Sequence, residues 1–157
     1  RANLYLDYEH TADDNAWPGG PYTDYIRAIT QNGSKLTGAK ISYNGGVESD
    51  IFKEILISRE GVYNSFETSF KINPGESVRL TLSYDLPINL SITKEQNQYG
   101  FVWQKQGGTG SDEYAFTFNP PFGTIIEAKS SSLNGTDKVL ESSGVFQKDL
   151  NFFVLLK

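Results

Sequence analysis

The chain has 157 residues, of which 38% are hydrophobic and 13% aromatic, and its formal net charge is −5. This length is that of one domain, and a fold of this size buries roughly 70% of the surface of its unfolded chain, so a stable core needs neither metal nor crosslink. The many large apolar side chains exclude intrinsic disorder, and 14 basic residues scattered among 19 acidic ones argue against binding to nucleic acid or to an anionic membrane surface.

Apolar and polar residues alternate along much of the chain, which is the pattern of strands with one buried face. In chain order the predicted strands are 4–8, 22–30, 35–43, 51–57, 66–72, 77–86, 98–105, 114–118, 123–129 and 152–156. The 77–86 strand is the clearest, because Val78, Leu80, Leu82 and Tyr84 share one face while polar residues occupy the other. The 51–57 strand is less regular and is expected to contain a bulge.

Turn signals such as Asn32-Gly33 and Asn73-Pro74-Gly75 separate these runs about every ten to twelve residues. No segment of ten or more residues has a helical period. We therefore predict an all-β fold, an antiparallel β-sandwich of immunoglobulin-like or jelly-roll-like type, with about ten strands and little helix, as a single domain over 1–157. Pro87 and the pair Lys53-Glu54 are expected to protect outer strands from pairing with other chains.

Residues for catalysis or metal binding are sparse. The chain has no cysteine and a single histidine, His10, whereas a serine hydrolase or a zinc site needs several partners. Asp13, Asp14 and Asn15 form an oxygen-rich run that is a weak candidate for calcium, but adjacent polar residues of this kind more often form a turn. We therefore expect no enzyme activity, no catalytic residue and no cofactor.

The segment from Trp17 to Tyr25 is the most unusual local feature, with two prolines, two glycines, one Trp and two Tyr. In one interpretation Trp17, Tyr22 and Tyr25 form a ligand-binding platform on which sugars stack. In the other, which we favour, Trp17 plugs one end of the sandwich and the tyrosine hydroxyls reach backbone partners.

The order of several short motifs resembles the C-terminal part of an uncharacterised bacterial family, domain of unknown function 4012, over nearly the whole chain. These motifs are Leu4 to His10 with Thr11-Ala12, Trp17-Pro18-Gly19-Gly20-Pro21-Tyr22, Tyr25-Ile26-Arg27, Gly33-Ser34-Lys35-Leu36, Asn73-Pro74-Gly75-Glu76-Ser77, Tyr84 with Leu86-Pro87, and Gln104-Lys105-Gln106. The chain departs from the family pattern at Ala28-Ile29-Thr30-Gln31, where the family continues with a Val-x-Val-Pro run. The resemblance implies an exported protein with this β-rich region displayed at the cell surface and a membrane anchor outside the given sequence.

These observations predict a non-catalytic, extracytoplasmic structural or interaction module of a bacterial cell-envelope protein, as a piece of a longer membrane-anchored chain. The expected partner is a cell-envelope glycan or a surface protein, with no nucleic acid and no membrane insertion within this fragment. The alternative is a carbohydrate-binding module that uses the aromatic residues of the 17–25 loop.

Overall fold

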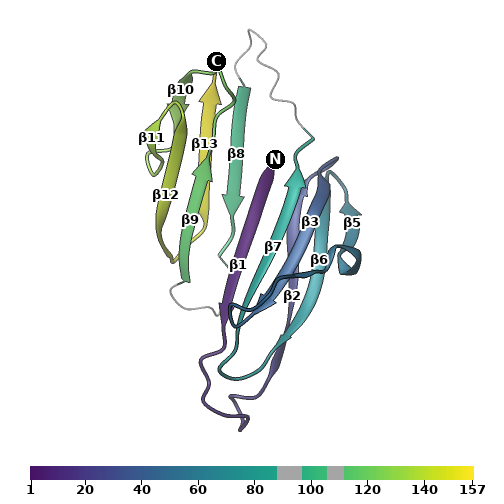
Figure 1. Cartoon of the computed structure of the whole chain (residues 1–157). Helices are drawn as coiled ribbons and strands as arrows, with labels where there is room; N and C mark the ends of the chain where they lie inside the picture. The colour runs from purple at the N-terminus through teal and green to yellow at the C-terminus, as the bar shows by residue number, and fades with distance from the viewer. Residues whose placement is uncertain (88–96, 106–111) are drawn as a thin grey trace. The chain divides into compact units, whose positions relative to one another are not determined.

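The computed structural model describes residues 1–87, 97–105 and 112–157. These residues form 13 strands, all paired antiparallel, and one turn of 3-10 helix (Figure 1). The prediction of an all-β antiparallel fold is confirmed. The chain divides into two compact units, Arg1–Asn89 and Leu90–Lys157, which we call unit 1 and unit 2. The expectation of a single domain over 1–157 stays a prediction, and each unit is described by itself.

Unit 1 contains two antiparallel sheets, with strand orders β1-β7-β3-β4 and β2-β6-β5. Its strands are β1 (Ala2–Glu9), β2 (Tyr22–Gln31), β3 (Lys35–Tyr43), β4 (Ser49–Asp50), β5 (Leu56–Glu60), β6 (Tyr63–Ile72) and β7 (Ser77–Asp85). Long regular registers join β1 to β7 and β2 to β6, so the alternation of side chains continues across each sheet.

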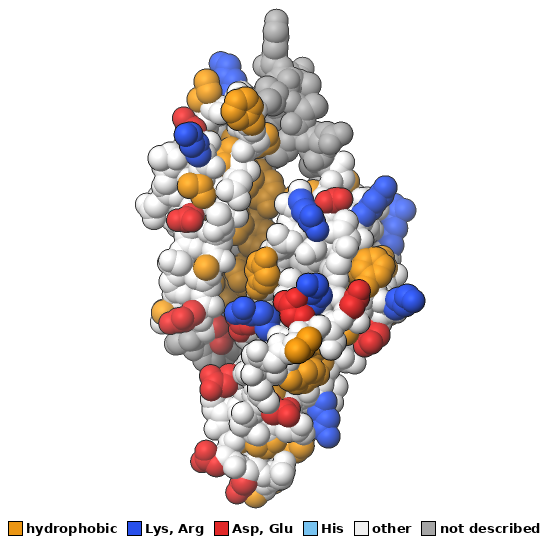
Figure 2. All heavy atoms as spheres, viewed as in Figure 1, with side chains coloured by type: hydrophobic (Ala, Val, Ile, Leu, Met, Phe, Trp, Pro, Cys, Tyr) orange, Lys and Arg blue, Asp and Glu red, His pale blue; other side chains and the backbone are white. Residues whose placement is uncertain are grey.

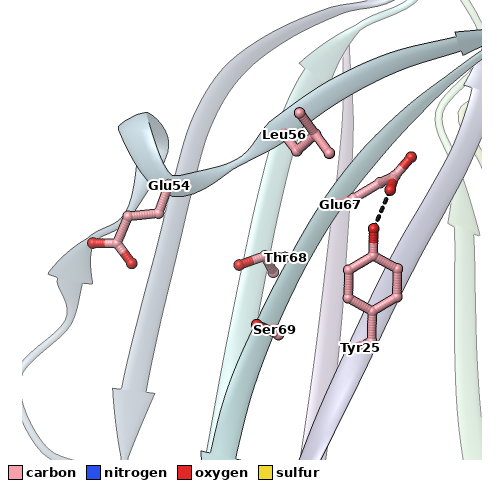
Figure 3. Close-up of a pocket in the computed structure, with 6 residues that line it drawn as sticks. All are labelled: Tyr25, Glu54, Leu56, Glu67, Thr68 and Ser69. Atoms are coloured by element: carbon pink, nitrogen blue, oxygen red, sulfur yellow. Dashed lines mark hydrogen bonds between the residues drawn. The ribbon is translucent and has the colours of Figure 1, made fainter.

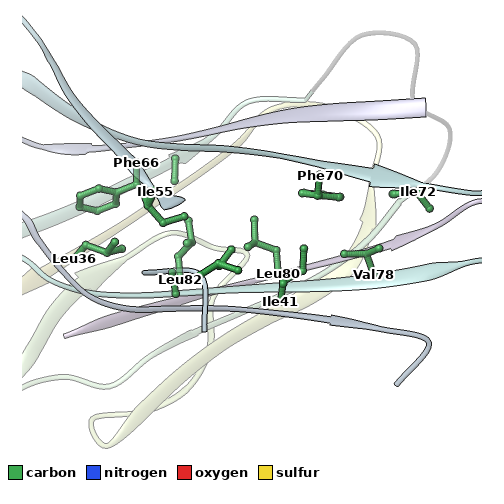
Figure 4. Packing of buried hydrophobic residues seen from close by; sticks show 12 residues of the cluster. Leu36, Ile41, Ile55, Phe66, Phe70, Ile72, Val78, Leu80 and Leu82 are labelled. Atoms are coloured by element: carbon green, nitrogen blue, oxygen red, sulfur yellow. The ribbon is translucent and has the colours of Figure 1, made fainter. Parts of the chain in front are cut away.

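The core of unit 1 lies between its two sheets. On β7, Val78, Leu80 and Leu82 are at most 2% exposed, which confirms the shared inner face expected from their alternation. Phe66 and Ile72 contribute from β6 of the other sheet, so the two sheets pack face to face as a sandwich (Figure 4). Buried apolar surface of this kind is the main stabilising contribution to the fold.

The predicted strand over 51–57 is wrong for residues 51–55, and only its last two residues lie in a strand. The structure has a 3-10 helix, η1 (Phe52–Glu54), followed by β5. Ile51 and Ile55 are both buried, whereas the three residues of η1 between them are all exposed, a pattern that strand alternation does not produce. The Asp50 carboxylate accepts the Phe52 N–H at 2.8 Å and so supports the start of the turn.

The expected edge protection by Pro87 and by Lys53-Glu54 is also wrong. Pro87 follows β7, a central strand paired with both β1 and β3. Lys53 and Glu54 lie in η1 and not in a strand.

Unit 2 contains two three-stranded sheets, with orders β10-β13-β8 and β11-β12-β9. Its strands are β8 (Asn97–Trp103), β9 (Asp112–Phe118), β10 (Ile126–Lys129), β11 (Asn134–Thr136), β12 (Val139–Phe146) and β13 (Leu150–Leu156). Leu140 of β12 and Val154 of β13 are both fully buried, so these two sheets also share a core. The sequence patterns missed β11 and β12.

Aromatic side chains dominate the packing of unit 2. The rings of Phe116 and Phe152 stack with centroids 4.5 Å apart, and Phe101 stacks on Phe116 at 5.1 Å. Trp103 is half-buried against Tyr114 and the ring of Phe146. These aromatic pairs add stabilisation to simple area burial.

Candidate functional site

The loop between β1 and β2 places Trp17 in solvent. The side chain is 95% exposed, so the interpretation of Trp17 as a plug for the sandwich is wrong. The loop is held by its own polar contacts, since His10 Nε2 lies 3.0 Å from the Gly20 carbonyl and the Gly19 N–H donates to the Ala16 carbonyl at 2.6 Å. These contacts close the loop on itself and leave no apolar surface over the indole.

The oxygen-rich run 13–15 belongs to the same loop. Asp14 Oδ1 accepts the Ala16 N–H at 2.8 Å, which is the turn geometry that aspartate favours. Within residues 1–87, 97–105 and 112–157, no three His, Cys, Asp or Glu side chains gather as metal ligands. Asp14 therefore helps to shape the loop that presents Trp17.

Tyr22 and Tyr25 project to opposite faces of β2. Tyr22 shares the phase of the inward-facing residues and packs on the ring of His10, with centroids 5.1 Å apart. Tyr25 belongs to the outward row and is 55% exposed. The three predicted binding residues therefore do not form one flat strip, because strand alternation separates the two tyrosines.

The outer face of the β2-β6-β5 sheet carries a buried carboxylate. Glu67 of β6 lies opposite Arg27 of β2 and Leu56 of β5, and its side chain is only 8% exposed. The Tyr25 hydroxyl donates to Glu67 Oε2, and the Ser58 hydroxyl donates to Oε1 at 2.5 Å. The Arg27 guanidinium lies 3.6 Å from the same Oε1. Both carboxylate oxygens are thus committed to side chains of the neighbouring strands.

This environment lowers the pKa of Glu67 to about 2. The hydrogen bond from Ser58 is the main cause and the one from Tyr25 comes next, because both stabilise the charged carboxylate. The same contact raises the pKa of the Tyr25 hydroxyl. A carboxylate with so low a pKa is a weak base and stays unprotonated near neutral pH, so it suits structural or binding roles better than general acid–base catalysis.

A pocket of about 310 Å³ lies beside this network. Figure 3 shows Tyr25 on one side of the pocket and Glu54 on the other, with Thr68 and Ser69 between them. Leu56, which is 60% exposed, adds an apolar wall. The pocket therefore combines an aromatic ring, an aliphatic side chain, carboxylates and hydroxyls.

Sequence reasoning identified Tyr25 but missed its partners. The alternation in 66–72 places Glu67 on the outer face, which is correct, yet it gives no sign that the side chain is buried there. That burial depends on the registers that bring Arg27 and Leu56 opposite Glu67. The one available signal of this network was that Tyr25 and Arg27 both lie at outward-facing positions of their predicted strand.

The charged surface of unit 1 is mixed. Figure 2 shows basic and acidic side chains scattered over the visible face of unit 1. Among the residues with described structure, no helix has the length and apolar character needed to cross a membrane.

Comparisons of this chain with protein family models, with curated proteins and with solved structures found no match.

Proposed function

We propose that this chain is a non-catalytic, extracytoplasmic interaction module of a bacterial cell-envelope protein, with the Trp17 loop as its main contact surface. The observation that carries the proposal is the 95% exposure of Trp17 on a loop closed by its own hydrogen bonds. The resemblance to domain of unknown function 4012 supports the extracytoplasmic location.

Because the Trp17 indole is exposed to water, the favourable free energy of burying its apolar surface is not realised in the free chain. Burying about 200 Å² of apolar surface at roughly 25 cal/mol per Å² would contribute on the order of 5 kcal/mol. A partner that covers Trp17 can gain this contribution with little ordering cost, because the loop already holds its shape. Tryptophan is also among the residues that dominate binding energy at interfaces.

The non-catalytic part of the proposal is supported by how the titratable groups are used. His10 is held against the Gly20 carbonyl, and Glu67 is held by Ser58 and Tyr25. Each of these side chains therefore has a structural role in its own neighbourhood.

The alternative was a carbohydrate platform built from Trp17, Tyr22 and Tyr25 together. The exposure of Trp17 favours it, but the opposite directions of Tyr22 and Tyr25 on β2 speak against one continuous strip. We therefore prefer a contact centred on Trp17 alone.

The test measures binding of the chain to purified bacterial cell-wall polysaccharide and to purified surface-layer protein, with W17A beside the wild type. We expect W17A to weaken binding about tenfold, which corresponds to about 1.4 kcal/mol. Acrylamide should quench the Trp17 emission in the free protein and quench it less in the complex. V47A is the matched control, because Val47 is 92% exposed in the same unit. Equal binding by W17A and V47A would contradict the proposal.

A further inference from the structure

The Tyr25 ring is a pre-positioned aromatic surface. Its hydroxyl donates to Glu67, whose carboxylate is held in turn by Ser58 and by the nearby Arg27 guanidinium. The ring is nonetheless 55% exposed, so the network fixes its position without covering it. A ring held in this way loses little conformational freedom when a ligand stacks on it.

Two other pocket residues supply polar groups near the ring. Ser69 lies directly across from Tyr25 in the β2–β6 register, and Glu54 lies beyond it in η1 (Figure 3). A carboxylate accepts hydrogen bonds with two oxygens, and a hydroxyl both donates and accepts. An apolar face opposite hydrogen-bonding groups matches a sugar ring, which has C–H groups on its faces and hydroxyls around its edge.

We propose that the Tyr25 pocket binds a neutral pyranose unit. The ring of Tyr25 and the side chain of Leu56 contact the C–H face of the sugar, while Glu54 and Ser69 hydrogen-bond its hydroxyls. The pocket volume of about 310 Å³ lies at the lower end of the range for ligand sites, so one ring fits rather than a long segment.

The charges of the pocket explain why the sugar is neutral. The Glu67 charge is offset by Arg27 and by two donated hydrogen bonds. Within the described part of the chain Glu54 has no ion-pair partner within 4.0 Å, so its negative charge at the edge of the pocket is not offset by an ion pair. An acidic sugar would meet like-charge repulsion there, which disfavours uronic acids.

This site goes beyond the proposed function, because it lies on the sheet face and does not use Trp17. The two can therefore fail independently. A chain that binds a partner through Trp17 alone would leave the pocket empty, and sugar binding that depends on Tyr25 would identify the pocket as a separate site.

The experiment titrates the full chain with soluble hexasaccharides of glucose, mannose, xylose and N-acetylglucosamine, and with oligogalacturonate and chitosan oligomers as acidic and basic probes. Amide chemical shifts in NMR spectra report affinity and location. We expect at least one neutral oligosaccharide to bind and to shift residues of β2, β6 and η1. Y25A should weaken this binding about tenfold or more, and Y25F should weaken it less, since the ring remains.

Two further variants sharpen the result. Y63A is the matched control, because Tyr63 is 53% exposed in the same outward row of β6 but does not line the pocket, and we expect it to bind as the wild type does. Among the described residues none forms a hydrogen bond or ion pair with the Glu54 side chain, so E54Q should leave the fold intact and reduce discrimination against oligogalacturonate.

Three outcomes would overturn the inference. The first is that no neutral oligosaccharide binds to the wild type. The second is that binding survives Y25A but is lost in W17A, which would assign the sugar to the loop. The third is that only chitosan binds and that salt abolishes the interaction, which would identify a nonspecific cation site.

Discussion

Glu67 shows how one residue can be placed on an outward face and still be buried. Its pKa of about 2 lies below the ordinary value of 4.5, so folding favours the charged form. The stabilisation that follows is fully present above about pH 4.5 and is lost as the pH falls toward 2. Acid should therefore weaken unit 1 in part through this one group.

The variant E67Q tests this link between pKa and stability. It removes the charge and keeps one oxygen acceptor, so only one of the two hydroxyl donors, Ser58 or Tyr25, retains its acceptor while an NH2 group faces the other. We expect E67Q to melt at a lower temperature than the wild type at pH 7, and the two melting temperatures to converge as the pH falls from 5 to 2. Thermal melts followed by circular dichroism measure this difference. Parallel curves would show that Glu67 has the same pKa in the folded and unfolded chains.

The same residue marks a limit of sequence reasoning. Alternation in the predicted 66–72 strand places Glu67 on the outer face, and this was right. Alternation does not say which strand pairs with this one or in which register, so the contacts of Glu67 with Arg27 and Ser58 could not be predicted. For Trp17, the size of the side chain suggested burial, but the hydrogen bonds of the loop decide its exposure.

At the scale of elements, most strands were predictable and β12 was not, for a reason visible in its packing. Its inner positions include Leu140, Ser142 and Phe146, so a small polar residue interrupts the apolar alternation. Ser142 is within hydrogen-bond distance of the Tyr114 hydroxyl at 3.0 Å, and a Cβ at Gly144 would lie 3.5 Å from the Tyr114 ring. Small residues are needed there because a large neighbour from β9 fills the space.

The β11–β12 hairpin depends on a glycine. Gly135 has φ +123°, and a Cβ there would lie 2.2 Å from the Val139 carbonyl oxygen. We expect G135A to destabilise unit 2 by about 1–3 kcal/mol, because the backbone would have to move. Urea unfolding followed by circular dichroism gives the free energy. In the same unit, Gly100 of β8 has open space around a Cβ, so G100A should be neutral or slightly stabilising. Similar losses in the two variants would argue against the steric explanation.

At the scale of the whole molecule, the structure shows two cores where the sequence suggested one domain. The cluster around Leu80 contains only residues of unit 1, and the cluster around Leu140 contains only residues of unit 2. Periodicity identifies which side of a strand is apolar but not which apolar sides meet. The division at residues 89 and 90 was therefore not visible in the amino-acid pattern, which shows no change in composition there.

The positions of the two tryptophans allow a direct test of whether the cores unfold separately. Trp103 packs among aromatic rings of unit 2, so its emission should change on unfolding, whereas Trp17 is already exposed in unit 1. L140A and L80A remove equally buried side chains, and each should cost about 2–5 kcal/mol in its own core. We expect L140A to lower the urea midpoint of the tryptophan signal and L80A to leave it unchanged, while circular dichroism registers both losses. If L80A shifts the tryptophan transition as far as L140A does, the two cores unfold together and the chain behaves as one cooperative domain.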